Sequence, residues 1–179
     1  SIYFDDNGTV PIITGKNVQV TGIDLSKVDF ITEESNKLLK KTQIYEGDLV
    51  SMRVGYPGRT CTVRKSEDGI NCCSLIITRK SNSIQSKILE YQLNSNIGKT
   101  QVELCQGGMG QQVVNLSDWN EFYVLTPHLS EQQQIVSYLD EQTHLIDKTI
   151  SIEEKRIELL KEYRQSLISE VVTGKRKVV

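Results

Sequence analysis

Residues 130–172, SEQQQIVSYLDEQTHLIDKTISIEEKRIELLKEYRQSLISEVV, form the stretch that decides the fold of this chain. Strong helix formers dominate it, and it contains neither proline nor glycine. Ser130 and Gln133 have the spacing of an N-terminal capping box. Gly174, which is followed by three cations, is typical of a helix C-terminus. The pattern predicts one unbroken helix over 130–172, roughly 64 Å long at about 1.5 Å per residue.

Apolar residues recur along this stretch in steps of three and four, with one extra step of four after Ile146. Such spacing is typical of a coiled-coil seam that contains a stutter, and polar seam residues can fix its register or direction. We interpret the helix as a coiled-coil element that pairs with a partner. The alternative is an amphipathic helix packed on its own domain. The seam consists of Ile135, Leu139, Gln142, Ile146, Ile150, Glu153, Ile157, Leu160, Arg164, Leu167 and Val171.

Residues 1–127 differ in composition, because all three prolines and all but one of the 12 glycines lie there. Two apolar patterns predict helices over 33–40 and 83–94. Since no alternating strand–helix–strand rhythm is present, we do not expect a doubly wound parallel sheet. The sequence predicts an α+β fold, with a mixed or antiparallel β-rich domain at 1–127 and a long coiled-coil-type helix within 128–179. The predicted strands span residues 10–14, 17–20, 48–54, 60–64, 73–79 and 121–125.

The charge of the chain is unevenly distributed. The net charge is −2 and the pI is near 5.8, which does not favour a general nucleic-acid coat. Between Arg53 and Lys87, however, lie seven cations and two acids, a local surplus of +5. A positive face of this kind can neutralise phosphates. The alternative is an ordinary solvated loop region in which cations cluster by chance.

The sequence indicates a cytoplasmic protein without a metal site. No apolar run approaches the roughly 20 residues of a membrane-spanning helix, and the N-terminus lacks the pattern of a signal peptide. The four cysteines include no C-x-x-C pair and lie far from the two histidines along the chain. Zinc-ligand spacing is therefore absent, and we expect reduced thiols that are mostly buried.

Motifs for catalysis are also absent from the sequence. It contains no G-x-x-x-x-G-K-[ST], no G-x-S-x-G and no H-E-x-x-H pattern. The glycine-rich run at 107–110 is followed by two glutamines and not by the lysine of a phosphate-binding loop. We therefore expect no independent enzymatic activity and no cofactor.

Three loops carry groups that can contact DNA. The loop at 55–60 contains a tyrosine and an arginine, and arginine is the usual bidentate reader of guanine. The loop at 107–112 contains two glutamines, which can read adenine, and the loop at 15–17 contains a lysine and an asparagine. Each loop has a plain alternative, since glycine turns are common in any fold. The candidate DNA-binding residues are Lys16, Asn17, Arg53, Tyr56, Arg59, Thr60, Arg64, Lys65, Gly108, Met109, Gln111 and Gln112.

The C-terminal helical run and the order of the motifs before it resemble one half of a specificity subunit from type I restriction-modification systems. The most specific match is the C-terminal helical run, which contains Pro127, Ser130–Ile135, Leu139-Asp140, Ile146-Asp147, Leu160–Ile168 and Val172–Lys175. Upstream, the order of features is similar: Gly8-x-Val10-Pro11-Ile12, Gly47–Val50, Gly55–Gly58 and a glycine loop before Trp119. The resemblance covers nearly the whole chain and is more diffuse in the first 127 residues.

The resemblance implies a noncatalytic protein whose target recognition domain reads half of a split sequence in double-stranded DNA. It implies that antiparallel helices set the spacing between two such domains, and that the subunit docks DNA methyltransferase and restriction subunits. Family members usually carry two recognition domains and two helical regions, so this chain corresponds to a half subunit or a C-terminal fragment. The strand and turn that usually precede Gly8 are missing, which implies a truncated N-terminus.

A half subunit can restore the family's two-fold arrangement by forming a homodimer through its long helix, because the seam from Ile135 to Val171 has no partner within the chain. A symmetric dimer would prefer an interrupted palindrome. The competing interpretation is a coiled-coil adaptor that binds proteins and does not read DNA. The two differ in salt dependence, since phosphate neutralisation gives an affinity that falls steeply with salt.

Overall fold

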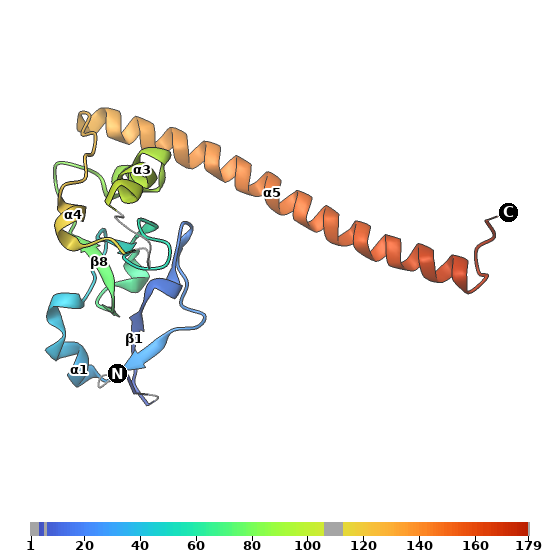
Figure 1. The fold of residues 1–179 in the computed structure, drawn as a ribbon, viewed down its shortest axis with the longest axis horizontal. Coiled ribbons are helices and arrows are strands. Elements are labelled where there is room, and N and C mark those ends of the chain that lie inside the picture. The colour runs from blue at the N-terminus through green and yellow to red at the C-terminus, as the bar shows by residue number, and fades with distance from the viewer. Residues whose placement is uncertain (1–3, 6, 106–112, 179) are drawn as a thin grey trace. The chain divides into compact units, whose positions relative to one another are not determined.

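The computed structural model describes residues 4–5, 7–105 and 113–178 and divides the chain into two compact units, Ser1–Gln133 and Gln134–Val179. The first unit combines short strands and helices, and the second consists mainly of one long helix (Figure 1). The predicted α+β class with a long C-terminal helix is confirmed.

A mixed three-stranded sheet is built around β1 (Val10–Ile13). β1 pairs antiparallel with β4 (Asp29–Ile31) and parallel with β7 (Asn71–Cys72). Ile12 and Ile31 of this sheet are buried in a small apolar cluster. The mixed pairing shows that β1 and β7, which are far apart in the sequence, lie side by side.

An antiparallel sheet is built around β5 (Leu49–Met52), which lies between β6 (Thr60–Thr62) and β8 (Leu75–Thr78). All four residues of β5 are buried, as expected for a central strand. A separate two-stranded hairpin consists of β2 (Val18–Gln19) and β3 (Gly22–Ile23). The main core of this unit contains Ile13, Val18, Ile23, Ile44, Val50, Met52, Cys61, Val63, Ile70 and Cys72.

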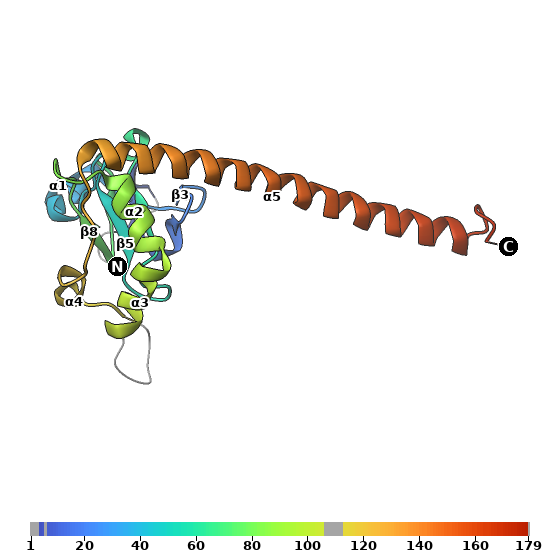
Figure 2. The same ribbon diagram turned by 90° about the horizontal axis from the view of Figure 1, so that it is seen from above.

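Helices of the first unit are short. The side chain of Thr32 accepts a hydrogen bond from the Ser35 N–H and so caps the first of them. The second, Ser86–Asn94, buries Ile88, Leu89 and Leu93 and lies beside the antiparallel sheet (Figure 2). The α-helices are α1 (Glu33–Leu38), α2 (Ser86–Asn94), α3 (Asn96–Cys105) and α4 (Leu116–Asn120), and the 3₁₀ segments are η1 (Gly15–Asn17), η2 (Lys40–Thr42) and η3 (Lys65–Glu67).

Helix α3 was not predicted from the sequence, because it follows α2 after the single residue Ser95 and contains a glycine. Gly98 is required there by packing: a Cβ at this position would lie 2.1 Å from the carbonyl oxygen of Leu93. A residue that looks like a helix breaker in the sequence is therefore the one that lets α3 approach the end of α2.

The predicted strand over 121–125 is wrong, although the backbone there is held by hydrogen bonds typical of a strand. The N–H and C=O groups of Tyr123 pair with the side-chain amide of Gln101 at 2.6 and 3.1 Å. Those of Leu125 pair with the amide of Gln92 at 2.7 and 2.8 Å. Two glutamines of α3 and α2 thus take the place of a neighbouring strand.

Several predicted elements are shorter in the structure, among them the helix expected over 83–94, which begins at Ser86, and the strand expected over 60–64, which ends at Thr62. Two of the corrections have a local physical cause. The strand expected over 17–20 is limited to Val18–Gln19, because Asn17 belongs to η1. The strand expected over 73–79 begins only at Leu75, since Ser74 has a φ of +57°, which interrupts extended backbone.

The long helix α5 spans Leu129–Val172 without interruption, as predicted. It begins one residue before Ser130, so the predicted capping role of Ser130 is wrong. At its C-terminus, Gly174 has a φ of +72° and the Arg176 N–H donates to the Glu170 carbonyl at 3.0 Å. Among the described residues, no helix combines the length and the apolar character needed to cross a membrane.

Candidate nucleic-acid interface

The loop that joins β5 to β6 carries Tyr56 and Arg59. The Met52 N–H donates to the Arg59 carbonyl at 2.8 Å, and the Gly58 N–H donates to the Met52 carbonyl at 3.0 Å. At the start of the loop, Val54 forms an isolated antiparallel β-bridge with Val113. The sequence folds this way locally because glycines with positive φ at both Gly55 and Gly58 turn the backbone.

Arg59 contacts both an aromatic ring and a side-chain amide. Its guanidinium lies 4.8 Å from the centre of the Tyr56 ring, within the range of a cation–π interaction. Its Nη1 donates to Oε1 of Gln19 at 3.1 Å, and Nε2 of Gln19 donates to the Lys16 carbonyl at 3.3 Å. Arg59 therefore has a fixed orientation, while its remaining N–H groups can still donate to a ligand.

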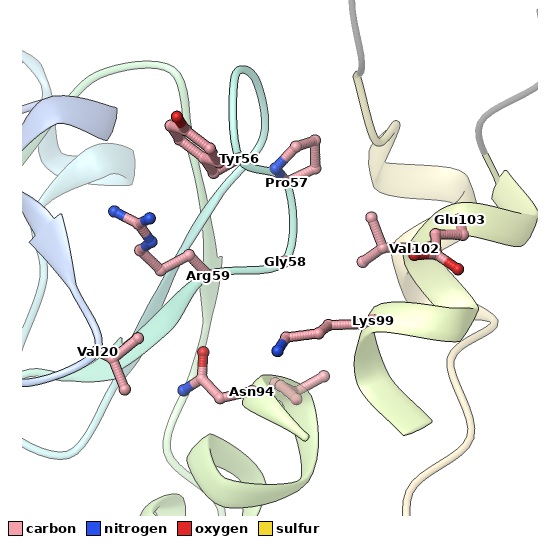
Figure 3. Close-up of a pocket in the computed structure, with 10 residues that line it drawn as sticks. Val20, Tyr56, Pro57, Gly58, Arg59, Asn94, Lys99, Val102 and Glu103 are labelled. Atoms are coloured by element: carbon pink, nitrogen blue, oxygen red, sulfur yellow. The ribbon is translucent and has the colours of Figure 1, made fainter. Parts of the chain in front are cut away.

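The loop and helix α3 border a cavity of about 540 Å³, which we call the hairpin pocket. Figure 3 shows Tyr56 and Arg59 on the loop side, with Lys99 extending from α3 toward the loop. The lining thus combines an aromatic ring, two cations, one carboxylate, one amide and several apolar side chains. Its residues are Val20, Tyr56, Pro57, Gly58, Arg59, Leu93, Asn94, Lys99, Val102 and Glu103.

Side chains of α2 cover the outer edge of β6, next to the pocket. Oδ1 of Asn94 accepts from the Thr60 N–H at 3.1 Å, and its Nδ2 donates to the Thr60 carbonyl at 2.7 Å. Oε2 of Glu90 accepts from the Thr62 N–H at 2.9 Å. An edge strand that would otherwise expose unpaired backbone groups is therefore closed, and the loop is anchored.

Two other predicted arginines are also held by neutral acceptors. Arg53 donates from Nε to the Val114 carbonyl at 3.2 Å, and Arg64 donates from Nη2 to the Thr21 carbonyl at 2.6 Å. Thr21 and Gln19 belong to the β2–β3 hairpin, so Arg59 and Arg64 both contact that hairpin. Within the described ranges, neither these two arginines nor Arg59 forms an ion pair.

Three of the seven cations between Arg53 and Lys87 pair with acids that lie just outside this segment. Lys65 lies 3.4 Å from Glu46, Arg79 lies 2.6 Å from Asp48, and Lys87 lies 2.6 Å from Glu90. The local surplus of +5 therefore overstates the free positive charge. Arg53, Arg59, Arg64 and Lys80 are the cations of the segment that no acid of the described chain neutralises.

A second depression of about 510 Å³ is also basic. Arg64, Lys80 and Lys87 line it together with Glu46, and the Lys80 side chain packs over Gly47. The arrangement offers point charges without an aromatic ring. It can hold an anion, but it presents no group that reads a base.

Of the other predicted DNA-binding residues, Lys16 is exposed and paired with Asp29 at 2.8 Å. Asn17 and Thr60 are fully buried, and their side chains serve the fold. Asn17 Nδ2 donates to the Asp24 and Lys27 carbonyls, and the Thr60 hydroxyl donates to the Gly58 carbonyl. Asn17 and Thr60 were predicted to contact DNA, but their burial and their hydrogen bonds to backbone carbonyls make them structural residues. Gly108, Met109, Gln111 and Gln112 lie outside the described residues.

Gln19, Asn94 and Lys99 were not identified from the sequence as site residues. Gln19 lies in a two-residue strand, and nothing in its neighbourhood in sequence indicates a contact with Arg59, 40 positions away. Lys99 lies on α3, which was itself unpredicted. Only a contact map or the structure places these residues beside the loop.

The cysteines do not form a candidate reactive or metal site. Burial raises the pKa of the Cys61 and Cys72 thiols to about 12. Among the residues that the structure describes, no group of three or more His, Cys, Asp or Glu side chains could hold a metal ion.

The predicted seam residues lie on one face of α5. Within the second unit, Ile146, Ile150, Ile157 and Leu160 are each at least half exposed. Ile135, Leu139 and Leu167 are partly exposed. These apolar side chains are therefore exposed along α5.

A family model described as the type I restriction modification DNA specificity domain matches residues 3–162. This range includes the whole hairpin pocket and most of α5. A search among curated proteins found no significant match.

Three solved structures share this fold. A chain from a study of complex assembly and conformational transition in the type I R-M system is 18% identical, with a TM-score of 0.67. The HsdS subunit from Thermoanaerobacter tengcongensis is 15% identical with a TM-score of 0.64, and the type I S subunit from M. genitalium is 17% identical with a TM-score of 0.54. The alignments cover 95%, 97% and 94% of this chain but only 40%, 45% and 41% of the respective relatives, so it spans less than half their length.

Proposed function

Because the chain belongs to the type I restriction modification DNA specificity family, we propose that it is a noncatalytic DNA-recognition subunit that reads one half of a split site. In this proposal, residues 1–127 form the target recognition domain. Residues 128–179 form the helix for dimerisation and spacing, with DNA methyltransferase and restriction subunits as further partners.

The observation that carries the proposal is the state of Arg59 in the hairpin pocket. A surface arginine without an acidic partner normally samples many conformations, whereas this one is held by Gln19 and by the Tyr56 ring. A guanidinium that is fixed and still has free donors matches the paired acceptors on the major-groove edge of guanine. Arg53, Arg64 and Lys80 add positive charge for phosphates.

The proposal is tested by selecting bound duplexes from a random library and measuring affinity for the selected site and for random DNA. We expect a selected site that contains guanine, and an affinity that falls steeply between about 50 and 200 mM salt. Arg59→Ala should weaken binding to the selected site by roughly 10- to 100-fold, the loss of one bidentate base contact, and affect random DNA much less.

Two variants serve as controls for this experiment. Arg64→Ala removes a cation that is held by a neutral carbonyl, and we expect similar losses on both DNAs. Lys37→Ala removes an exposed cation of α1 and should change neither affinity. Equal losses from Arg59→Ala on both DNAs would contradict base readout. A protein without DNA affinity at low salt would favour the coiled-coil adaptor.

Docking of the modification subunit is tested separately, by mixing the full chain with the methyltransferase subunit of a type I system encoded beside it. We expect co-elution in size-exclusion chromatography and methylation of the selected site only when both proteins are present. Methylation by this chain alone would contradict a noncatalytic role.

A further inference from the structure

The first unit has a second basic cavity, at the opposite end of α2 from the hairpin pocket. This cavity is the depression of about 510 Å³, which we call the basic depression, and Gln85 and Ser86 at the start of α2 are part of its wall. The hairpin pocket lies where α2 ends, with Leu93 and Asn94 in its lining. Among the described residues, the two cavities share no lining side chain, so the basic depression is a separate candidate site.

Positive charge in the basic depression is only partly neutralised. Arg64, Lys80 and Lys87 line it together with one carboxylate, that of Glu46. Lys87 and Glu46 each have an ion-pair partner outside the lining, so neither contributes net charge. Arg64 and Lys80 form no ion pair with any residue that the structure describes. Their charge is therefore left for a ligand, which must be an anion.

Both of these cations are held by contacts that leave their charge intact. Arg64 Nη2 donates to the Thr21 carbonyl at 2.6 Å, and a Cβ at Gly22 would lie 2.6 Å from the same nitrogen. The Lys80 side chain packs over Gly47, where an added Cβ would lie 2.7 Å from its Cδ. Because the two side chains are already positioned, an anion that binds them costs less conformational entropy than it would with mobile cations.

The lining also includes a polar group that the described chain leaves unsatisfied. Thr62 lines the basic depression, and its hydroxyl oxygen is buried without a hydrogen-bond partner among the described residues. A buried hydroxyl in this state lowers stability, and such a group in a native fold often has a role in binding. Rotation about χ1 allows the hydroxyl to donate to an oxygen of a bound anion.

The N-terminus of α2 adds further positive character. Ser86 and Lys87 are the first two residues of this nine-residue helix, and both line the basic depression. The N-terminal end of a helix carries a partial positive charge and N–H groups without an acceptor in the helix itself. Phosphate oxygens accept from guanidinium, ammonium, hydroxyl and helix N–H groups alike, so this combination suits a phosphate.

We propose that the basic depression binds one phosphate of the DNA backbone, close to the base that the hairpin pocket reads. Ser86 and Asn94 are eight positions apart, about 12 Å along α2. The major groove is also about 12 Å wide, so a duplex whose base edge reaches Arg59 has backbone phosphates within reach of the depression. The inference rests on the proposed function and adds a defined contact that fixes the position of the duplex.

Lys80→Gln tests the site, because it removes the charge and keeps most of the stem that packs over Gly47. Affinity for the selected and the random duplex should fall equally, by about threefold to fivefold at low salt, since a phosphate contact carries no sequence information. The slope of log affinity against log salt should decrease in magnitude by about one. Lys80→Arg should restore both quantities. Lys37→Gln, which removes an exposed cation of α1, should change neither.

A neutral methylphosphonate linkage, introduced at one position of the selected duplex at a time, identifies the phosphate that is bound. We expect one position at which neutralisation weakens binding of the wild-type chain by about threefold to fivefold and leaves binding of Lys80→Gln unchanged. Equal losses for the two proteins at every position, or a Lys80→Gln chain with wild-type affinity and salt slope, would overturn the proposal.

Thr62→Val separates a binding role from a structural one. Valine has nearly the same shape and removes the unsatisfied hydroxyl, so the midpoint of urea unfolding should rise. Affinity for both duplexes should nevertheless fall by about threefold, because a donor to the phosphate is lost. A more stable variant that binds DNA as tightly as the wild-type chain would contradict the site as defined.

Inorganic phosphate, titrated at constant ionic strength, distinguishes the DNA backbone from a free anion. Amide chemical shifts of Ser86 and Lys80 that respond to phosphate, together with DNA binding that is independent of Lys80, would indicate a free-phosphate site and overturn the proposal. Selected-site binding that depends on Arg59 but not on Lys80 would overturn this inference and leave the proposed function intact. If Lys80→Gln behaves as expected but Arg59→Ala weakens both duplexes equally, base readout fails and the phosphate site stands.

Discussion

The guanidinium of Arg59 donates to the side-chain oxygen of Gln19 at 3.1 Å, across 40 positions of sequence. Gln19 is itself oriented, because its amide nitrogen donates to the Lys16 carbonyl. The chain of contacts runs from Lys16 through Gln19 to Arg59 and ends on the Tyr56 ring. A neutral acceptor orients the arginine and leaves its positive charge available, whereas a carboxylate would neutralise it.

The first prediction from the contact between Arg59 and Gln19 concerns the variant Gln19→Met. Methionine fills a similar volume but accepts no comparable hydrogen bond, so Arg59 loses its fixed orientation. We expect affinity for the selected site to fall about fivefold, equivalent to about 1 kcal/mol, with random DNA unaffected. Quantitative fluorescence anisotropy with the selected and the random duplex measures the ratio of the two affinities.

Gln19→Glu tests the role of neutrality in the same contact. It keeps an acceptor for Arg59 but adds a negative charge, so affinity for both duplexes should fall and the salt dependence should weaken. If Gln19→Met lowered affinity for the selected and the random duplex equally, Gln19 would be a general structural residue and not a positioning residue for Arg59.

Gly58 and Gly55 provide a matched pair of substitutions in the β5–β6 loop. Both have a φ of +86°, but a Cβ at Gly58 would lie 2.6 Å from Val102 of α3, whereas Gly55 faces open space. Gly55→Ala should lower the free energy of unfolding by about 1 kcal/mol through backbone strain alone. Gly58→Ala should lower the free energy of unfolding by about 1–3 kcal/mol more than Gly55→Ala, because the added Cβ overpacks the contact with α3. Urea denaturation measures both.

Val102→Ala distinguishes packing from strain in this comparison. Combined with Gly58→Ala, it should recover most of the additional loss, since the clash involves the Val102 side chain. If the effects of the two substitutions on the free energy of unfolding were additive, the β5–β6 loop and α3 would not be in tight contact, contrary to the geometry of the hairpin pocket.

Sequence reasoning predicted elements whose signal is local and missed those that depend on distant partners. Helix α5 and strand β5 were predicted because helix propensity and an apolar run are visible without context. Helix α3 was missed because Gly98 is explained only by the Leu93 carbonyl. In the candidate interface, Tyr56 and Arg59 were proposed from residue type alone, whereas Gln19 could not be, and Thr60 was included although its burial removes it from any surface.

The erroneous strand at 121–125 leads to a prediction of its own. Gln92→Ala with Gln101→Ala removes the four hydrogen bonds that hold Tyr123 and Leu125, and alanine preserves both helices. We expect amide exchange at Tyr123 and Leu125 to accelerate by about fivefold or more, at about 1 kcal/mol per lost bond. The Phe122 amide, which donates to the Trp119 carbonyl, serves as an internal control. Equal acceleration at Phe122 would indicate unfolding of the whole segment instead.

The buried thiols give a prediction on pH dependence. Burial raises the pKa of Cys61 and Cys72 from 9.0 to about 12, and the nearby Glu90 carboxylate adds to the effect at Cys61. Because the thiolate is the reactive form, both should resist alkylation in the folded protein at pH 8–9 and react fully in urea. Mass spectrometry of the alkylated peptides distinguishes these cysteines from Cys73 and Cys105.

The same shifts predict how stability changes at high pH. In the unfolded chain both thiols lose protons near pH 9, whereas in the folded chain they keep them to about pH 12, so the folded state binds more protons in this window. The free energy of unfolding should therefore be unaffected by these groups below about pH 8 and fall as pH rises from 9 toward 12. Cys61→Ala with Cys72→Ala should lower stability at pH 7 through lost packing but flatten this decline. A double variant that kept the full slope would show that other groups cause the alkaline loss.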